Sequence, residues 1–359
     1  MLFTFPKIVK ELLSTFSERD YPVLNTRLFI SCWLGFALDQ SLESMRDLFK
    51  RLNLGGIELD MSTFSKANQH RNVEPFQDLY QQILSLVKRK KAKGRSQTQP
   101  KDRQKSEDIY EICPIDSTVI TLTSKLLWAL GYHQVKLLNI FNNSDETGEF
   151  PLIHFGQSHD YKFATQMTEK LTSKQVGVMD RGFASLEYIK ELKTQKKFFV
   201  VRLNLNYKME PLATGEWQVG TGKHQEIYRV LWFCNLETKE EYRIVTNLPH
   251  TVSDEDIAEI YRQRWRIELF WKFLKMHLKL DHLISKNLNG ITLQLYSCLI
   301  AYLILHLVDI PEMWGHHLLD KLRYLQACMS QEFSYVHWIH RILHNRPFRL
   351  IIGSPELVI

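Results

Sequence analysis

The sequence has few cysteines, and none of them is paired at a C-x-x-C spacing. An odd, scattered set argues against a disulfide framework and against a structural zinc site, and it is typical of a reducing compartment. We therefore expect a cytoplasmic protein. The five cysteines are Cys32, Cys113, Cys234, Cys298 and Cys328.

Long hydrophobic runs are also scarce. The N-terminal stretch MLFTFPKIVKELL is interrupted by Pro6, Lys7 and Lys10, so we expect it not to act as a signal peptide. The most apolar run, residues 295–310, contains His306 and is short for a membrane span. We interpret it as a buried helix and expect no membrane partner.

Positive charge is concentrated in one segment. Residues 88–105, KRKKAKGRSQTQPKDRQK, hold nine basic residues and one acidic residue, whereas the whole chain has a net charge of +6. We predict a basic linker over 88–106. Such a run can be a solvated tether, or it can follow a phosphate backbone and release counterions, and both interpretations stay open.

The chain before this linker, 1–87, has the apolar periodicity of helices. NLGG breaks the pattern, and DMSTFSKANQHR starts a further helix with Asp60 or Ser62 as its N-cap. A helix, a glycine-containing turn and a polar, basic second helix indicate a helix-turn-helix reader of DNA, although ordinary helical hairpins share this pattern. The change of composition at the linker predicts that 1–87 can be deleted without unfolding the rest.

After the linker the period of the pattern changes to that of strands. DIYEICPIDSTVITLTS, HQVKLLNIFNN and FPLIHFGQS read as three successive strands, and QVGVMD reads as a short buried strand that ends at Asp180. Strands dominate again over 197–248. Ser253 then forms a capping box with Asp256 at the start of a long helix.

That helix contains the segment YRQRWRIELFWKFLKMHLKL, residues 261–280. Tyr261, Arg264, Glu268 and Lys275 are offset by 3, 7 and 14 residues from the first, which places them within roughly 60° on one face of a continuous helix. A solvated stripe with helix-spaced ion pairs would give the same pattern. The alternative is a site in which Arg264 and Lys275 bind phosphate and Glu268 binds a metal ion.

Two aspartates are suited to complete such a site. Asp116 lies in ICPIDSTVITL, and Asp180 precedes Arg181-Gly182 at a strand end, where a carboxylate can face a cleft. Each alone is more simply a turn or capping residue. Together with Glu268 they form a set of hard oxygen ligands that Mg²⁺ prefers, and two such ions can serve phosphodiester chemistry.

In this order, DST, DRGF and Y-x2-R-x3-E-x6-K resemble the DDE transposases of bacterial insertion sequences, specifically the IS-four family, relatives of the Tn-five transposase. The resemblance covers roughly 107–305 and includes His159-Asp160, RIVTNL and QLYSCLIAYLILHL. STFSKANQHR is similar to the DNA-binding region of the family, less specifically.

The resemblance implies an α/β fold with a ribonuclease-H-like catalytic core over 107–305. A β-rich insertion at about 197–248, a helical DNA-binding region at 1–87 and a helical C-terminal region at 306–359 would complete the chain. It also implies catalytic and metal-binding roles for Asp116, Asp180 and Glu268, with two Mg²⁺ ions, or Mn²⁺ as a substitute. Tyr261, Arg264 and Lys275 would contact DNA phosphates.

The expected function is cut-and-paste transposition of an element whose ends the protein binds. The expected partners are double-stranded DNA, both element ends and target, and a second copy of the chain when DNA is bound, so the protein would associate with the nucleoid. Relatives also stack an expelled base on an aromatic residue, for which Trp217 and Trp232 are candidates or else core residues. Two alternatives remain: a recombination endonuclease on the same fold, and an inactive DNA-binding descendant.

Overall fold

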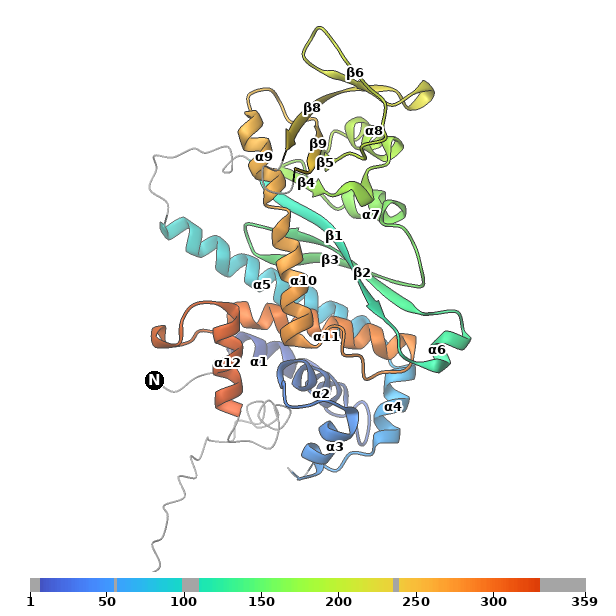
Figure 1. The fold of residues 1–359 in the computed structure, drawn as a ribbon. Coiled ribbons are helices and arrows are strands. Elements are labelled where there is room, and N and C mark those ends of the chain that lie inside the picture. Colours follow the sequence, from blue (N-terminus) through green and yellow to red (C-terminus); the bar gives the residue numbers. More distant parts are fainter. Residues whose placement is uncertain (1–6, 55–56, 99–109, 235–238, 330–359) are drawn as a thin grey trace, which may run out of the picture.

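A computed structural model describes residues 7–54, 57–98, 110–234 and 239–329 of the chain. The helices α1 to α4, α11 and α12 gather at one end of the molecule, α7, α8 and α9 flank the strands at the other end, and α10 runs between the two (Figure 1). The helices are α1 Lys7–Ser14, α2 Thr26–Leu38, α3 Met45–Leu54, α4 Met61–His70, α5 Glu74–Thr98, α6 Lys125–Ala129, α7 Ala164–Thr168, α8 Leu186–Thr194, α9 Asp254–Arg262, α10 Trp265–Leu278, α11 Leu288–Leu307 and α12 Leu318–Met329.

The described strands form one sheet in the order β3-β2-β1-β4-β5-β9-β8-β7-β6. β1, β4 and β5 are parallel to one another, and β2 and β3 add to β1 as an antiparallel hairpin. This mixed α/β arrangement is consistent with a ribonuclease-H-like core. The strands are β1 Glu111–Thr121, β2 Gln134–Asn142, β3 Thr147–Phe155, β4 Gln175–Met179, β5 Phe198–Arg202, β6 Met209–Pro211, β7 Trp217–Val219, β8 Glu226–Cys234 and β9 Glu241–Thr246.

The β-rich insertion begins later than predicted. β5 pairs in parallel with β4, so it belongs to the central sheet, and the insertion starts after residue 202 rather than at 197. Strand propensity identified FFVVR correctly as a strand, but propensity does not say which neighbour a strand pairs with. β9 and β8 then continue the same sheet, because β9 pairs antiparallel with β5.

α11 is apolar on every side and is buried on every side. It is long and apolar enough to cross a membrane, yet 94% of its most apolar window is buried inside the protein. One hydrophobic cluster joins it to the N-terminal helices, to α10 and to one face of β1 and β2. The prediction of a buried helix in this region is confirmed, although the helix ends at Leu307 and so crosses the boundary predicted at 305.

The N-terminal region is therefore no separate unit. α2, α4 and α5 all pack against α11, and Trp33 of α2 is fully buried in the shared cluster. Lys279, just after α10, is buried, and its Nζ donates to the main-chain carbonyls of Phe36, Asp39 and Leu42 at the C-terminal end of α2. The expectation that deletion of 1–87 removes end recognition but leaves a folded core conflicts with this packing, because the deletion would expose one side of α11.

The basic segment is also different from the predicted linker. α5 continues through residue 98, so the first part of the segment is helical, and residues 99–105 lie outside the described part of the chain. Its lysines and arginines favour helix, and several of them pair with acidic residues of the β2–β3 hairpin or of the segment after α11. These pairs are Lys88–Glu149 at 2.7 Å, Lys90–Asp309 at 2.7 Å, Lys91–Glu146 at 2.6 Å and Arg95–Asp145 at 2.8 Å.

We expect Leu303→Ala to destabilise both ends of the molecule together. Leu303 is 1% exposed in α11, and truncating such a leucine costs about 2–5 kcal/mol through lost burial and the cavity left behind. Hydrogen exchange followed by mass spectrometry should show α2 and α10 losing protection in step. Leu126→Ala, at a leucine that is 69% exposed, is the matched control. Loss of protection in one region alone would contradict a shared core.

Candidate active site

The register of the sheet brings the two aspartates together. Ile115 of β1 lies opposite Met179 of β4, and Asp116 and Asp180 are the residues that follow this pair. In neighbouring parallel strands about 4.8 Å apart, residues at matching positions point to the same face. The two carboxylates, which are 64 residues apart in sequence, are therefore neighbours, and both are half-buried.

The turn after β4 holds Asp180 in place. Its Oδ1 accepts a hydrogen bond from the main-chain nitrogen of Gly182 at 2.8 Å, which caps the short 3₁₀ turn Arg181–Phe183. A β-carbon added at Gly182 would lie 3.0 Å from that oxygen. The glycine in DRGF therefore leaves room for the carboxylate.

Asp116 has the electrostatics of a ligand site that a cation completes. Burial is the main cause that raises its pKa to about 7, and the negative charges of Asp180 and Asp160 raise it further. The Ser117 main-chain hydrogen bond and the charge of Arg264 act in the opposite direction. A divalent cation would relieve this repulsion, and the carboxylate oxygens present are the donors that Mg²⁺ takes.

Glu268 is on α10 and is held by Arg264. Arg264 Nη2 lies 2.7 Å from Glu268 Oε1, and the side chains are 17% and 31% exposed. The same guanidinium is close enough to Asp116 to influence its pKa. Arg264 therefore connects the glutamate to the aspartates across the gap between helix and sheet.

The continuous helix predicted over 261–280 is interrupted. α9 ends at Arg262 and α10 begins at Trp265, with 3₁₀-type bonds from the Arg264 nitrogen to the Tyr261 oxygen and from the Ile267 nitrogen to the Arg264 oxygen. The Asn143 amide donates to the Gln263 carbonyl, which would otherwise accept from Ile267. Helix periodicity cannot reveal such a donor, because it comes from the β2–β3 turn.

The remaining residues of the predicted stripe lie on either side of Glu268. Tyr261 is buried, with its ring 5.8 Å from the Arg264 guanidinium and 6.1 Å from the Tyr242 ring. Lys275 reaches β1, where its Nζ donates to the Val119 carbonyl at 3.4 Å. The four residues thus stay on the side of α9 and α10 that faces the sheet, despite the interruption.

The three acids do not form a preassembled cage. Within the described ranges, no three carboxylate, histidine or cysteine side chains are close enough together to hold a metal ion. The sheet pairs Asp116 with Asp180, whereas Glu268 is held by its ion pair with Arg264. A cation bound by the aspartates would have to draw Glu268 from that partner.

Sequence reasoning missed two charged residues beside the aspartates. Asp160 accepts hydrogen bonds from Ser117 Oγ at 2.9 Å and from Lys136 Nζ at 2.5 Å. The sequence did carry signals for both: the His159-Asp160 pair is part of the family resemblance, and Lys136 is the one charged residue in the apolar strand QVKLLNIFN.

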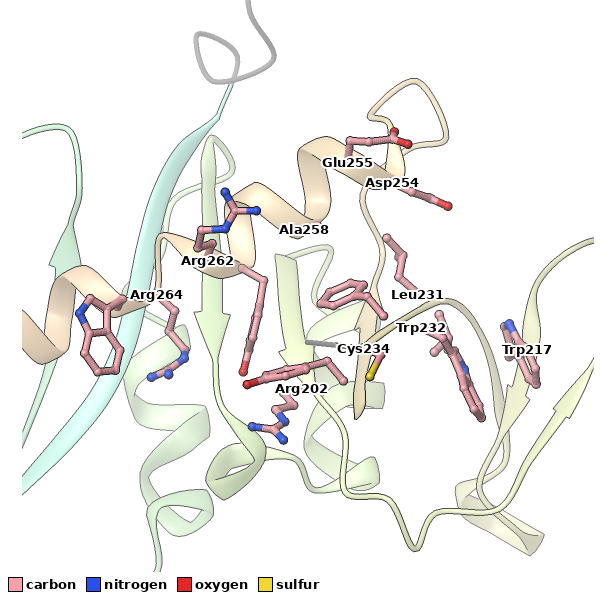
Figure 2. Close-up of a pocket in the computed structure, with 15 residues that line it drawn as sticks. Arg202, Trp217, Leu231, Trp232, Cys234, Asp254, Glu255, Ala258, Arg262 and Arg264 are labelled. Atoms are coloured by element: carbon pink, nitrogen blue, oxygen red, sulfur yellow. The ribbon is translucent and has the colours of Figure 1, made fainter. Parts of the chain in front are cut away.

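A pocket of about 860 Å³ opens beside this site, between the insertion strands and α9. Figure 2 shows Arg264 and Arg202 towards one side of it and Trp232 and Trp217 on the other. The two indole rings are stacked at 5.5 Å, and the Arg243 guanidinium lies 4.3 Å from the Trp232 ring. Trp232 is 47% exposed, so it is not a core residue.

Comparison with known proteins agrees with this arrangement. Residues 107–304 match the family described as Transposase DDE domain. The chain is 48% identical over 349 residues to the "Putative transposase for insertion sequence element IS4SA" of Synechocystis sp., an alignment that covers 95% of this chain and 99% of that protein. It is 28% identical over 212 residues to the "Probable transposase for insertion sequence element IS5377" of Geobacillus stearothermophilus, covering 53% and 55% of the two chains.

We expect Asp116→Asn to stabilise the metal-free protein in a pH-dependent way. Folding raises the pKa of Asp116, so the free energy of unfolding falls as pH rises from about 4 to about 7. Above pH 7 this loss of stability stays constant. The asparagine variant should gain up to about 4 kcal/mol relative to the parent at pH 8 and progressively less below pH 7. Urea denaturation at several pH values measures this difference. A pH-independent difference would contradict the assigned cause.

Proposed function

Because the chain belongs to the family of DDE transposases, we propose that Asp116, Asp180 and Glu268 are the carboxylates that perform its chemistry. The protein is a DNA transposase, an enzyme of metal-dependent strand cleavage and strand transfer. The placement of Asp116 and Asp180 at matching positions of adjacent parallel strands is the observation that carries the assignment.

The carboxylates would hold two Mg²⁺ ions, with Mn²⁺ as a substitute, and such ions supply an activated oxygen nucleophile and charge neutralisation at the phosphate. Asp116 and Asp180 offer oxygens from the sheet and Glu268 offers one from α10. Arg264 keeps Glu268 beside the sheet and is freed to bind a phosphate when the glutamate moves. Lys275, further along α10, would contact a second phosphate, and Tyr261 would add a hydrogen bond.

The arginine- and tryptophan-lined pocket would receive a base expelled from the DNA duplex. A half-exposed indole offers a stacking surface, and the surrounding guanidinium groups suit the flanking phosphates. The pocket lies next to Arg264, so an unstacked nucleotide there would be adjacent to the scissile phosphate. This assignment follows the family resemblance and gives Trp232 the stacking role.

α4 is the candidate element for recognising the element ends. Phe64, Ala67 and Asn68 face the protein interior, whereas the opposite side of the helix is polar and exposed. Asp60 caps its N-terminus, where its carboxylate accepts from the Ser62 nitrogen at 3.0 Å. A short helix packed on a second one and presenting polar side chains can enter a major groove. The exposed side chains are Ser62, Ser65, Lys66, Gln69 and His70.

We also propose the subfamily, the type of transposition, the oligomeric state and the cellular location of the protein. The protein would act as an IS-four family member, related to the Tn-five transposase, in cut-and-paste transposition. It would work as a homodimer on paired ends, away from membranes and associated with the nucleoid. A helical C-terminal region would follow the core; its part from 330 on lies outside the described residues.

Asp180→Asn should abolish detectable strand cleavage and leave binding to element ends nearly unchanged. The amide retains an oxygen for the Gly182 hydrogen bond, so the turn is preserved while the metal-ligand charge is lost. Incubation with end-bearing duplexes and Mg²⁺, followed by mapping of breaks and of joined products, measures both steps. Asp281→Asn, at an exposed aspartate, is the control. Normal nicking by Asp180→Asn would disprove the carboxylate assignment.

Arg89→Gln with Lys93→Gln should weaken the salt dependence of DNA binding. Both residues are exposed on α5, and each phosphate contact contributes about −0.9 to the slope of log affinity against log salt, so we expect a change of up to about 2 units. Lys90→Gln with Lys91→Gln is the matched double variant, because those lysines pair with Asp309 and Glu146. If the slope of Arg89→Gln with Lys93→Gln equals that of the parent protein, a DNA path along this face is excluded. Preference among end sequences should be unaffected, since phosphate contacts carry no sequence information.

A further inference from the structure

The loop that carries Asp160 is anchored from inside the sheet. Lys136 lies in β2, its side chain is 7% exposed, and the residues around it in the strand are apolar. A buried ammonium is costly unless its hydrogen-bonding capacity is satisfied. Its Nζ donates to the Ser158 carbonyl at 2.6 Å and to Asp160 Oδ1 at 2.5 Å, so the lysine holds both ends of the short segment 158–160.

The two oxygens of Asp160 have different surroundings. Oδ1 accepts from Lys136 and also from Ser117 Oγ, the residue next to Asp116 on β1. Oδ2 faces the turn after β4: a β-carbon built on Gly182 would lie 3.5 Å from Asp160 Oδ2 and 3.0 Å from Asp180 Oδ1. The two carboxylate oxygens therefore lie no farther apart than the sum of these two distances, and both border the space that glycine leaves open.

The fixed orientation of Asp160 has an energetic consequence. A third carboxylate beside Asp116 and Asp180 adds repulsion between like charges: Asp160 is joined to β1 through Ser117 and borders the same Gly182 space as Asp180. Such an arrangement costs stability in the protein alone unless a nearby cation compensates. Lys136 compensates the charge of Asp160. The negative charges of Asp116 and Asp180 remain, at the place where the proposed function puts a divalent ion.

We propose that Asp160, fixed by Lys136 and Ser117, is a positioning residue of the metal centre, and that its Oδ2 would accept hydrogen bonds from the water shell of a cation held by Asp116 and Asp180. The proposal rests on the proposed function, because it presupposes that Asp116 and Asp180 bind the cation. Lys136 acts in turn through Asp160. The pair thus forms an outer layer around the acidic site, comparable to hydrogen-bond partners that orient metal ligands elsewhere.

The test measures Mn²⁺ binding to the full-length protein, using the electron paramagnetic resonance signal of the free ion. Asp160→Asn should raise the Mn²⁺ dissociation constant by about 10- to 100-fold, the usual effect of losing such a partner. Its binding to end-bearing duplexes in EDTA should stay unchanged, which shows that the variant is folded. Asp281→Asn, the same chemical change at an exposed site, should bind Mn²⁺ like the parent.

A second pair of variants tests the anchoring by Lys136. Lys136→Met should weaken Mn²⁺ binding to a similar degree, and the double variant with Asp160→Asn should be no worse than either single variant, because the two residues act as a unit. Ser117→Ala, which removes one donor to Asp160 Oδ1, should weaken it less, and it replaces Lys136→Met if that variant does not fold.

The outcomes separate this proposal from the proposed function. If Asp180→Asn loses Mn²⁺ binding while Asp160→Asn keeps parental affinity, the role of Asp160 is overturned and the catalytic assignment stands. Loss of Mn²⁺ binding by Asp160→Asn together with loss of DNA binding in EDTA also overturns it, since that shows a general structural role. If Asp116→Asn and Asp180→Asn both bind Mn²⁺ normally, the proposed function itself fails.

Discussion

A helix that is apolar all round must be covered all round, and this requirement of α11 organises the molecule. The N-terminal helices cover one side of it and α10 covers another, so the element that carries Glu268 rests on the same support as the candidate DNA-reading helix α4. Lys279 strengthens this junction, because its buried ammonium satisfies carbonyls at the end of α2. The position of α10 over the sheet is therefore fixed from outside the sheet.

Cations and carboxylates are distributed unevenly over the candidate site. Arg264 is paired with Glu268 and Lys136 is paired with Asp160, whereas Asp116 and Asp180 repel each other across adjacent strands. The outer acids are thus paired with cationic side chains, whereas the charges of the inner pair repel each other. This imbalance suits the divalent-cation site proposed above, in which the bound cation would supply the missing positive charge.

Local patterns in the sequence were sufficient for most elements. Alternating β-branched residues predicted β1 to β3, the Ser253 capping box predicted the start of α9, and the glycine after Asp180 marked a strand end. The errors came from contacts that are distant in sequence. The interruption of the helix at Gln263 involves a donor from the β2–β3 turn, and the helical state of the basic segment is accompanied by ion pairs with Asp145 and Glu146.

The same reasoning explains how far the site could be foreseen. Asp116 and Asp180 could be paired only by knowing that β1 and β4 are neighbours in register, which the family resemblance supplied and periodicity did not. Asp160 joins them through a loop whose course depends on Lys136, a single buried charge in an apolar strand. Residue type and the family resemblance thus singled out the acids as candidates, and the sheet register brings Asp116 and Asp180 close together.

The late position of α11 in the chain has a consequence for synthesis. A ribosome releases the N-terminal helices long before it reaches Leu288, so their apolar faces wait for a partner that is made more than two hundred residues after α2 begins. A prematurely terminated product would lack this partner, and the apolar faces of α2, α4 and α5 would stay uncovered. If α4 reads DNA as proposed, the ability to occupy DNA would depend on completion of α11, and incomplete chains would not compete with finished enzyme for its sites.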